Sequence, residues 1–69
     1  MKLSARNLLK GTVKKIVNGP VSAEVTIELP GGAEIVSTIT ESSAERLGIK
    51  QGSQVYAVSK ASSVMLAVD

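Results

Sequence analysis

The chain has 69 residues and a net charge of +2, and it contains no Cys, no His, no Phe and no Trp. Its length predicts a single domain, residues 1–69. The composition excludes disulfide bonds, catalysis by His or Cys, and a structural metal held by those residues. The weak positive charge permits an anionic ligand, whereas a typical nucleic-acid binder carries a much denser basic surface.

Location and assembly are also constrained by composition. Residues 1–7 lack the apolar run of a signal peptide. No stretch approaches the roughly 20 apolar residues of a membrane span. We therefore expect a cytoplasmic protein without a membrane partner. A small core with Tyr56 as its single aromatic residue would be marginal alone, so we also expect association between copies of the chain.

The first predicted strand contains Leu9, Val13 and Val17 and precedes the turn Asn18-Gly19-Pro20. Gly11 predicts a bend in this strand. An Asn-Gly pair between apolar runs favours a tight hairpin, because both residues tolerate positive φ. The lysines of this segment are typical of an edge strand protected by charge; they are Lys10, Lys14 and Lys15.

The clearest strand is Val21 to Leu29, in which apolar and polar residues alternate over nine positions. This period of two predicts one buried face and one solvated face. Glu24 and Glu28 lie on its polar side, which favours solvated strand surface over a catalytic carboxylate pair. After the turn Pro30-Gly31-Gly32, the β-branched run Ile35 to Thr40 predicts a third strand.

A short helix is predicted from Thr40 to Gly48. Thr40 or Ser42 can cap it, Ser42 with Glu45 fits a capping box, and Gly48 is a typical C-terminal stop. Val55–Ser59 and Val64–Val68 predict two further strands. The order β-β-β-α-β-β indicates an all-β, OB-like five-stranded barrel with one short helix between strands 3 and 4. An open five-stranded sheet is the structural alternative.

Two polar clusters are candidates for binding. They are Ser4-Ala5-Arg6-Asn7 near the start and Lys60-Ala61-Ser62-Ser63 between the last two strands. Each alone is typical of solvated surface. Together they offer hydrogen-bond donors and positive charge without an acidic residue, which suits a deprotonated tetrahedral dianion that has acceptors only. No residue pattern predicts an enzyme.

These clusters also carry a resemblance to a known family. The segments SARNLLKG at 4–11 and VSKASSVMLA at 58–67 are similar to the molbindins, the stand-alone molybdate-binding Mop proteins. The resemblance spans nearly the whole chain. It implies an OB-like barrel assembled as a hexamer, a trimer of dimers, that stores or buffers molybdate or tungstate at subunit interfaces. It implies no catalysis and no cofactor beyond the oxyanion ligand, with no metal held directly by side chains.

The resemblance also implies the ligand-binding residues. Those expected from one subunit are Ser4, Ala5, Arg6 and Asn7; those from another are Lys60, Ala61 and Ser62; Thr40 and Ser43 would complete a site. Thr40 and Ser43 have an independent reason, because the first turn of a helix attracts anions. A plain N-cap is an equal alternative for Thr40.

Two other functions stay open at this stage. A nucleic-acid-binding OB domain would stack bases on aromatic side chains, and Tyr56 alone is a poor basis for that. A structural or sensory subunit could use the anion only as a switch for a partner chain. The ranking of molybdate, tungstate and sulfate is not encoded in these patterns, because all three are tetrahedral dianions.

Overall fold

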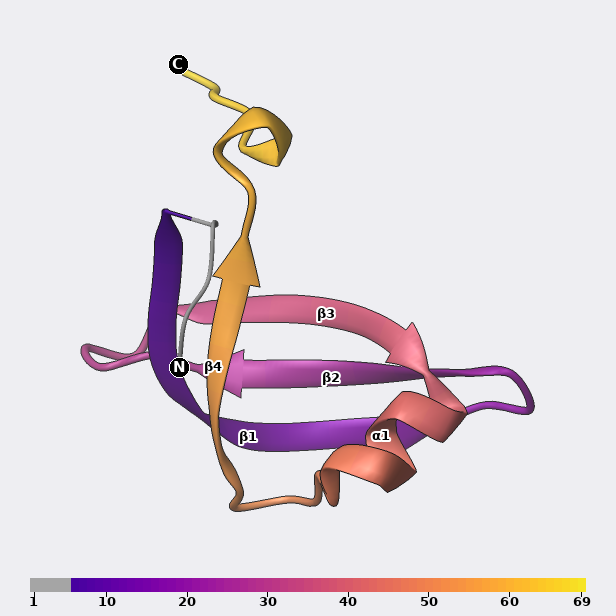
Figure 1. The fold of residues 1–69 in the computed structure, drawn as a ribbon. Helices are drawn as coiled ribbons and strands as arrows, with labels where there is room; N and C mark the ends of the chain where they lie inside the picture. Colours follow the sequence, from indigo (N-terminus) through magenta and orange to yellow (C-terminus); the bar gives the residue numbers. More distant parts are fainter. Residues whose placement is uncertain (1–5) are drawn as a thin grey trace.

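The computed structural model describes residues 6–69. Figure 1 shows a curled antiparallel sheet that forms an open half-barrel, with one short helix beside it. The sheet order is β3-β2-β1-β4. The elements are β1 (Asn7–Asn18), β2 (Ser22–Glu28), β3 (Glu34–Thr40), α1 (Glu41–Leu47), β4 (Gln54–Ser59) and the 3-10 helix η1 (Ala61–Ser63).

Strand β1 bends sharply, and the bend lets it pair with two strands (Figure 1). Its first half pairs with β4 from Asn7 to Thr12, and its second half pairs with β2 from Thr12 to Asn18. Gly11 lies at the bend, as predicted, and a Cβ there would approach Ile27 Cγ2 to 2.6 Å. The register shifts between Val13 and Lys15, which is a bulge. Strand β1 is thus central, and the prediction that its lysines protect an edge is wrong.

The predicted hairpin between β1 and β2 forms, but its turn differs from the expected one. The Gly19 N–H donates to the Ser22 carbonyl at 2.8 Å, and residues 19–21 connect the strands. Neither Asn18 nor Gly19 has positive φ. Pro20 is the physical reason, because a residue before proline is restricted to extended conformations.

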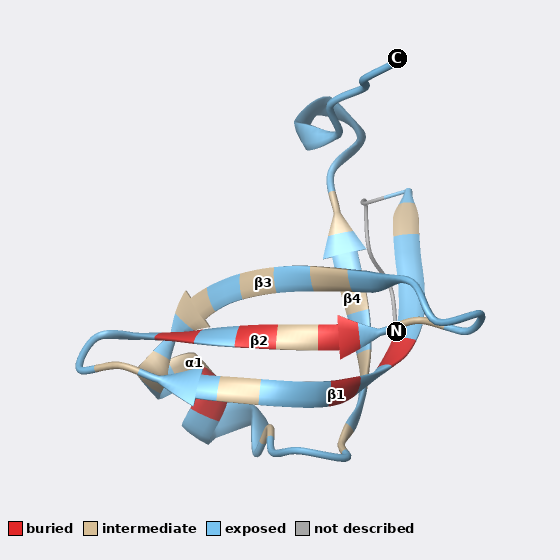
Figure 2. Cartoon of the chain, turned by 180° about the vertical axis from the view of Figure 1, so that it is seen from behind, coloured by how far each residue is buried: buried red, intermediate tan, exposed pale blue. Residues whose placement is uncertain are grey.

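The core lies on the concave face of the sheet, where Val13, Val25 and Ile27 are buried against each other. Figure 2 shows buried residues alternating with exposed or half-buried ones along β2. The predicted alternation is therefore confirmed within the strand. Val21 lies before β2 and is 75% exposed, so the buried face is shorter than the sequence pattern indicated.

The predicted helix is confirmed as α1. Thr40 is its N-cap, and Gly48 ends it in the left-handed conformation at φ 66°. The capping box at Ser42 does not form, because the helix begins two residues earlier, where the Thr40 hydroxyl accepts from the Ser43 N–H. Ala44 is the buried residue of this helix.

The fifth predicted strand is not formed within one chain. Residues Val64–Asp69, which we call the C-terminal arm, have no strand assignment and are all exposed. The arm leaves the fold after η1 and extends beyond the end of β4 (Figure 1). A strand forms only by pairing with the edge of another strand, and the arm pairs with none among residues 6–69. The all-β, OB-like class is confirmed, while one chain contributes four paired strands of the barrel among residues 6–69.

Candidate functional site

The two polar clusters predicted from the sequence meet at one end of the β1–β4 ribbon. Asn7 begins β1 and pairs with Ser59, the last residue of β4. Arg6 therefore precedes one strand of this pair, and Lys60 follows the other. Arg6 and Lys60 are both exposed, and Asn7 is half-buried. Ser4 and Ala5 lie outside the described residues.

The Lys60 cluster forms a tight turn that leaves backbone donors available. Lys60 precedes η1 and makes no side-chain cap hydrogen bond. The bonds of the turn use the N–H groups of Ser63, at 2.9 Å from Lys60 O, and of Val64, at 3.4 Å from Ala61 O. The N–H groups of Ala61 and Ser62 lie before these donors, where the first amides of a helix have no partner within it.

Thr40 and Ser43 form the cap of α1. The Thr40 hydroxyl accepts from the Ser43 N–H at 3.1 Å and donates to Ser43 Oγ at 2.7 Å. The N-cap role expected for Thr40 is therefore present in the single chain. Ser43 keeps its own hydroxyl hydrogen as a donor. Glu41 adds a carboxylate to the same turn, and its Oε2 is buried without a hydrogen-bond partner among residues 6–69.

One chain does not bring all the candidate residues together. The end of β4 carries the Arg6–Asn7 and Lys60–Ser62 donors, whereas the start of α1 carries Thr40 and Ser43. These two places lie apart in the fold (Figure 1). Any site that used both groups would need residues from more than one copy.

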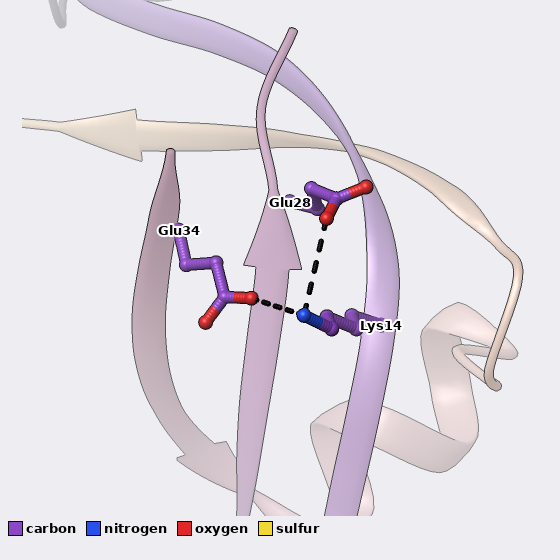
Figure 3. Close-up of polar contacts among 3 residues, drawn as sticks. All are labelled: Lys14, Glu28 and Glu34. Atoms are coloured by element: carbon purple, nitrogen blue, oxygen red, sulfur yellow. Dashed lines mark hydrogen bonds and ion pairs between the residues drawn. The ribbon is translucent and has the colours of Figure 1, made fainter. Parts of the chain in front are cut away.

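An ion-pair cluster joins three neighbouring strands of the sheet, with Lys14 on β1, Glu28 at the end of β2 and Glu34 at the start of β3. Figure 3 shows Lys14 between Glu34, to which its ammonium donates a hydrogen bond, and Glu28 at 3.9 Å. The hydrogen bond to Glu34 and the Glu34 charge, followed by the Glu28 charge, raise the pKa of Lys14 above its ordinary value of 10.5. Lys14 is the residue at which the β1–β2 register shifts. The cluster contains one lysine and two glutamates. Its net charge is therefore negative, and it does not suit an anion.

Sequence reasoning missed an apolar groove, because it assumed that the last strand closes the barrel. The groove has a volume of about 400 Å³ and runs between β3 and β4. Residues that line it include Ile35, Val36, Ile39, Leu47, Val55 and Ala57. The signal for it was the run Val64–Val68, whose residues are apolar on both alternating faces and so need a cover on both sides.

Two further observations concern metals and membranes. Within the part of the chain that the structure describes, no three acidic, His or Cys side chains gather as a metal site. The same part contains no helix long and apolar enough to cross a membrane.

The fold and the donor clusters define a small OB-like β protein with anion-suited groups at one end of a two-stranded ribbon. Residues 3–66 match the TOBE domain family model. The chain is 47% identical over 66 residues to molybdenum-pterin-binding protein 2 of Clostridium pasteurianum, covering 96% of this chain and 97% of that protein. It is 45% identical to the probable molybdenum-pterin-binding protein of Haemophilus influenzae, with 100% of both chains covered.

Two solved structures are also similar to this chain in both fold and sequence. MopII from Clostridium pasteurianum has a TM-score of 0.92 at 45% identity, with 97% of this chain and 100% of that chain covered. The molybdate-bound form of the cytoplasmic molybdate-binding protein ModG has a TM-score of 0.96 at 52% identity; all of this chain matches 49% of that one. This chain belongs to the molbindin (Mop) family of TOBE-domain proteins. These relatives are binding proteins, not enzymes, and the expectation of a non-enzyme is confirmed by them.

Proposed function

We propose that this protein binds molybdate or tungstate in the cytoplasm and stores or buffers it at interfaces between subunits. One observation carries the proposal: the Asn7–Ser59 pairing in the β1–β4 ribbon joins two donor clusters that are far apart in the sequence. The names of the relatives, which describe molybdate and molybdenum–pterin binding, support the same ligand.

The chemistry of this ribbon end fits a dianion without a proton. Arg6 and Lys60 supply positive charge, and the backbone at Ala61 and Ser62 supplies neutral donors. Charge-assisted hydrogen bonds to such a ligand are about twice as strong as neutral ones. The acidic side chains nearest in sequence, Glu24 and Asp69, lie outside both clusters. The Ser4 and Ala5 positions would add further donors from the same segment.

We assign Thr40 and Ser43 to the completed site as contributors from another subunit. Their distance from the ribbon end within one chain (Figure 1) supports an inter-subunit arrangement, and so does the small aliphatic core. In this proposal the assembly is a hexamer, a trimer of dimers. The Glu41 carboxylate in this turn would oppose the attraction of the helix N-terminus for an anion, so in this proposal Ser43 contributes a hydrogen bond from its hydroxyl group.

Calorimetric titration of the purified protein with molybdate, tungstate, sulfate and phosphate tests the proposal. Near neutral pH much of the phosphate carries a proton, and a donor-only site leaves that O–H unmatched, at a cost of roughly 1–3 kcal/mol. Phosphate should therefore bind at least about tenfold more weakly than molybdate. Equal affinities for all four anions would show that the protein reads charge alone.

The same series separates two other ligands. A free pterin belongs in it, because relatives are named for a molybdenum–pterin compound. A single-stranded oligonucleotide tests the nucleic-acid alternative, and we expect no binding. The open groove is lined mainly by aliphatic side chains, which provide neither base stacking nor phosphate neutralisation.

A further inference from the structure

The tip of the β1–β2 hairpin carries a residue pair with a reactivity of its own. Asn18-Gly19 is the only Asn-Gly sequence in the chain. Because glycine has no Cβ, its backbone nitrogen can reach the side-chain carbonyl carbon of a preceding asparagine. Asn18 is exposed at the end of β1, so water has access to its amide. The pair is therefore a candidate for deamidation, the loss of the side-chain amide nitrogen as ammonia.

The reaction needs water and no other reagent. The Gly19 nitrogen loses its proton and bonds to Cγ of Asn18, the Cγ–Nδ2 bond breaks, and ammonia leaves. The product is a five-membered succinimide ring. Water then opens the ring at either of its carbonyl groups, which gives aspartate or isoaspartate at position 18. In isoaspartate the main chain runs through the former side chain and is one carbon longer.

The folded turn opposes the first step in two ways. The Gly19 N–H donates a hydrogen bond to the Ser22 carbonyl at 2.8 Å, which holds the proton that the nitrogen must lose. Asn18 is also a strand residue that pairs with Ala23. Closing the ring requires its ψ angle to rotate out of the extended range of a strand. The reaction therefore requires the tip of the hairpin to open.

The tip has few buried contacts that would keep it closed. Its exposed residues include Val17, Pro20, Val21 and Ser22. The Glu41 N–H donates to the Val21 carbonyl at 2.9 Å and ties the tip to the start of α1. Segments with exposed backbone bonds and few buried apolar contacts open at a lower free energy than the core does. Local opening of the tip, without unfolding of the sheet, is therefore the route to the reaction.

We propose that Asn18 is a deamidation site that the β1–β2 turn protects in the folded chain, and that opening of the tip converts it to aspartate and isoaspartate. The rate in the folded protein is then the intrinsic rate multiplied by the fraction of molecules with an open tip. Water does not restore the amide, so the modified fraction only rises with time.

The modification changes both the charge and the geometry of the tip. Either product lowers the net charge of +2 by one. In the isoaspartate form the extra main-chain carbon lies directly before Gly19, which displaces the Gly19 N–H from the Ser22 carbonyl. The pairing of position 18 with Ala23 is disturbed for the same reason, as it is at a bulge.

Peptide mapping measures the reaction at this one residue. Trypsin cleaves after Lys15 and Arg46, and the peptide 16–46 between them contains Asn18 as its only Asn or Gln residue. The purified protein is incubated at pH 8 without oxyanion, in buffer and in guanidinium chloride, and is digested after timed intervals. Deamidation raises the mass of the peptide, and chromatography separates the aspartate and isoaspartate forms. We expect conversion to be at least about tenfold faster in denaturant than in buffer, with both products present.

Three results would overturn the proposal. Equal rates in buffer and in denaturant would show that the turn does not protect Asn18. No conversion in denaturant would show that this pair is not reactive. Aspartate without isoaspartate would show direct hydrolysis of the amide in place of ring closure. The measurements contain no oxyanion, so they do not bear on the proposed function.

Two controls test the chemistry of the pair in denaturant, where folding plays no part. Asn7 is followed by Leu8 and lies in the tryptic peptide 7–10. It should stay unconverted over the same period, because the leucine side chain obstructs ring closure. Gly19→Ala should slow the conversion of Asn18 severalfold for the same reason. An unchanged rate in Gly19→Ala would contradict attack by the Gly19 nitrogen.

Pro20→Gly tests whether local opening sets the rate. Pro20 is exposed in the turn, and glycine there gives the tip more backbone freedom. The ratio of the rate in buffer to the rate in denaturant should rise severalfold above that of the wild type. Pro30→Gly, at an exposed proline between β2 and β3, is the matched control and should keep the wild-type ratio. Circular dichroism checks that both variants keep their strands. A wild-type ratio in Pro20→Gly, or an equal rise in Pro30→Gly, would overturn local opening of the tip.

Discussion

Arg6 and Lys60 are solvent-exposed in a single chain, yet the β1–β4 pairing holds them at the same ribbon end. If both contact one oxyanion buried between subunits, Arg6→Ala or Lys60→Ala should each weaken molybdate binding by about 2–4 kcal/mol. Arg6→Lys should also weaken it, because a planar fork and a point charge are not interchangeable. Calorimetry measures these affinities. Lys15→Ala, an exposed lysine of β1, is the matched control and should bind as the wild type does.

Circular dichroism is the folding control for these variants, since neither Arg6 nor Lys60 belongs to the buried core. The alternative is that both are solvated surface charges. Each substitution would then change affinity slightly, and added salt would remove the difference. Near-wild-type affinity in two folded variants would refute the site and leave the fold.

Lys14 should give a stability difference that depends on pH. Its pKa is raised in the folded state by Glu34 and then Glu28. The contribution is therefore fully present below the ordinary pKa of 10.5 and is lost as pH rises through the folded-state value. Thermal unfolding of Lys14→Met should show a lower Tm than the wild type at pH 8, and the gap should close in alkali. The gap should be small, because Lys14 is exposed.

Lys15→Met serves as the neighbour control for Lys14→Met and should keep a Tm close to that of the wild type at pH 8, because the ion pairs to Glu28 and Glu34 are made by Lys14. A gap between Lys14→Met and wild type that persists unchanged in strong alkali would mean that packing of the lysine stem, not its charge, is responsible.

At the scale of single elements, the sequence allowed either Thr40 or Ser42 as the N-cap of α1, and mutation can distinguish the two. Thr40 caps α1 through the Ser43 N–H at 3.1 Å. Thr40→Ala should therefore reduce the free energy of unfolding by about 0.5–2 kcal/mol, and Thr40→Ser should reduce it much less. Ser42→Ala should have little effect, whereas the capping box expected from Ser42 and Glu45 would make it the costly change. Urea denaturation measures all three.

The bend in β1 depends on Gly11. A Cβ at this position would lie 2.6 Å from Ile27 Cγ2 and 2.8 Å from the Glu28 carbonyl oxygen. Gly11→Ala should destabilise the protein by about 1–3 kcal/mol through overpacking. Thr12→Ala, at the exposed neighbour, should change stability by less than about 0.5 kcal/mol. Wild-type urea midpoints for Gly11→Ala would mean that the strand can straighten at no cost.

Local chemistry made most elements predictable. The alternation around Val25 and the β-branched run before Thr40 correspond to β2 and β3, and the Gly48 stop corresponds to the end of α1. The turn at Asn18-Gly19 was expected in the wrong conformation, because the restriction by Pro20 outweighs the preference of Asn-Gly. The arm was expected as a paired strand, because five apolar residues in a row indicate a need for burial, but a residue pattern does not show what they pack against.

For the candidate site, the sequence identified donor clusters but not their placement. The pairing of Asn7 with Ser59 is a long-range contact that no local pattern encodes. Thr40 was identified for two roles at once, and the single chain shows the cap. Its role toward an anion stays a prediction, as do those of the other site residues.

For the whole molecule, the small core predicts that stability depends on assembly. Among residues 6–69, the buried hydrophobic residues are Val13, Ala23, Val25, Ile27 and Ala44. Burial of so few aliphatic side chains offsets little of the conformational entropy of folding. Light scattering at micromolar concentration and neutral pH should give the mass of a hexamer, and the Tm should rise with protein concentration. A stable monomer would refute the assembly and the inter-subunit site with it.

Tyr56 gives this molecule an unusual optical property. It is the only aromatic residue of the chain, it is 50% exposed, and it lies at the β4 margin of the groove. Absorbance and fluorescence in the near ultraviolet therefore arise from a single chromophore that is outside the core. A change in tyrosine emission would report what occupies the groove, while the unfolding of the aliphatic interior would be followed separately by far-ultraviolet dichroism.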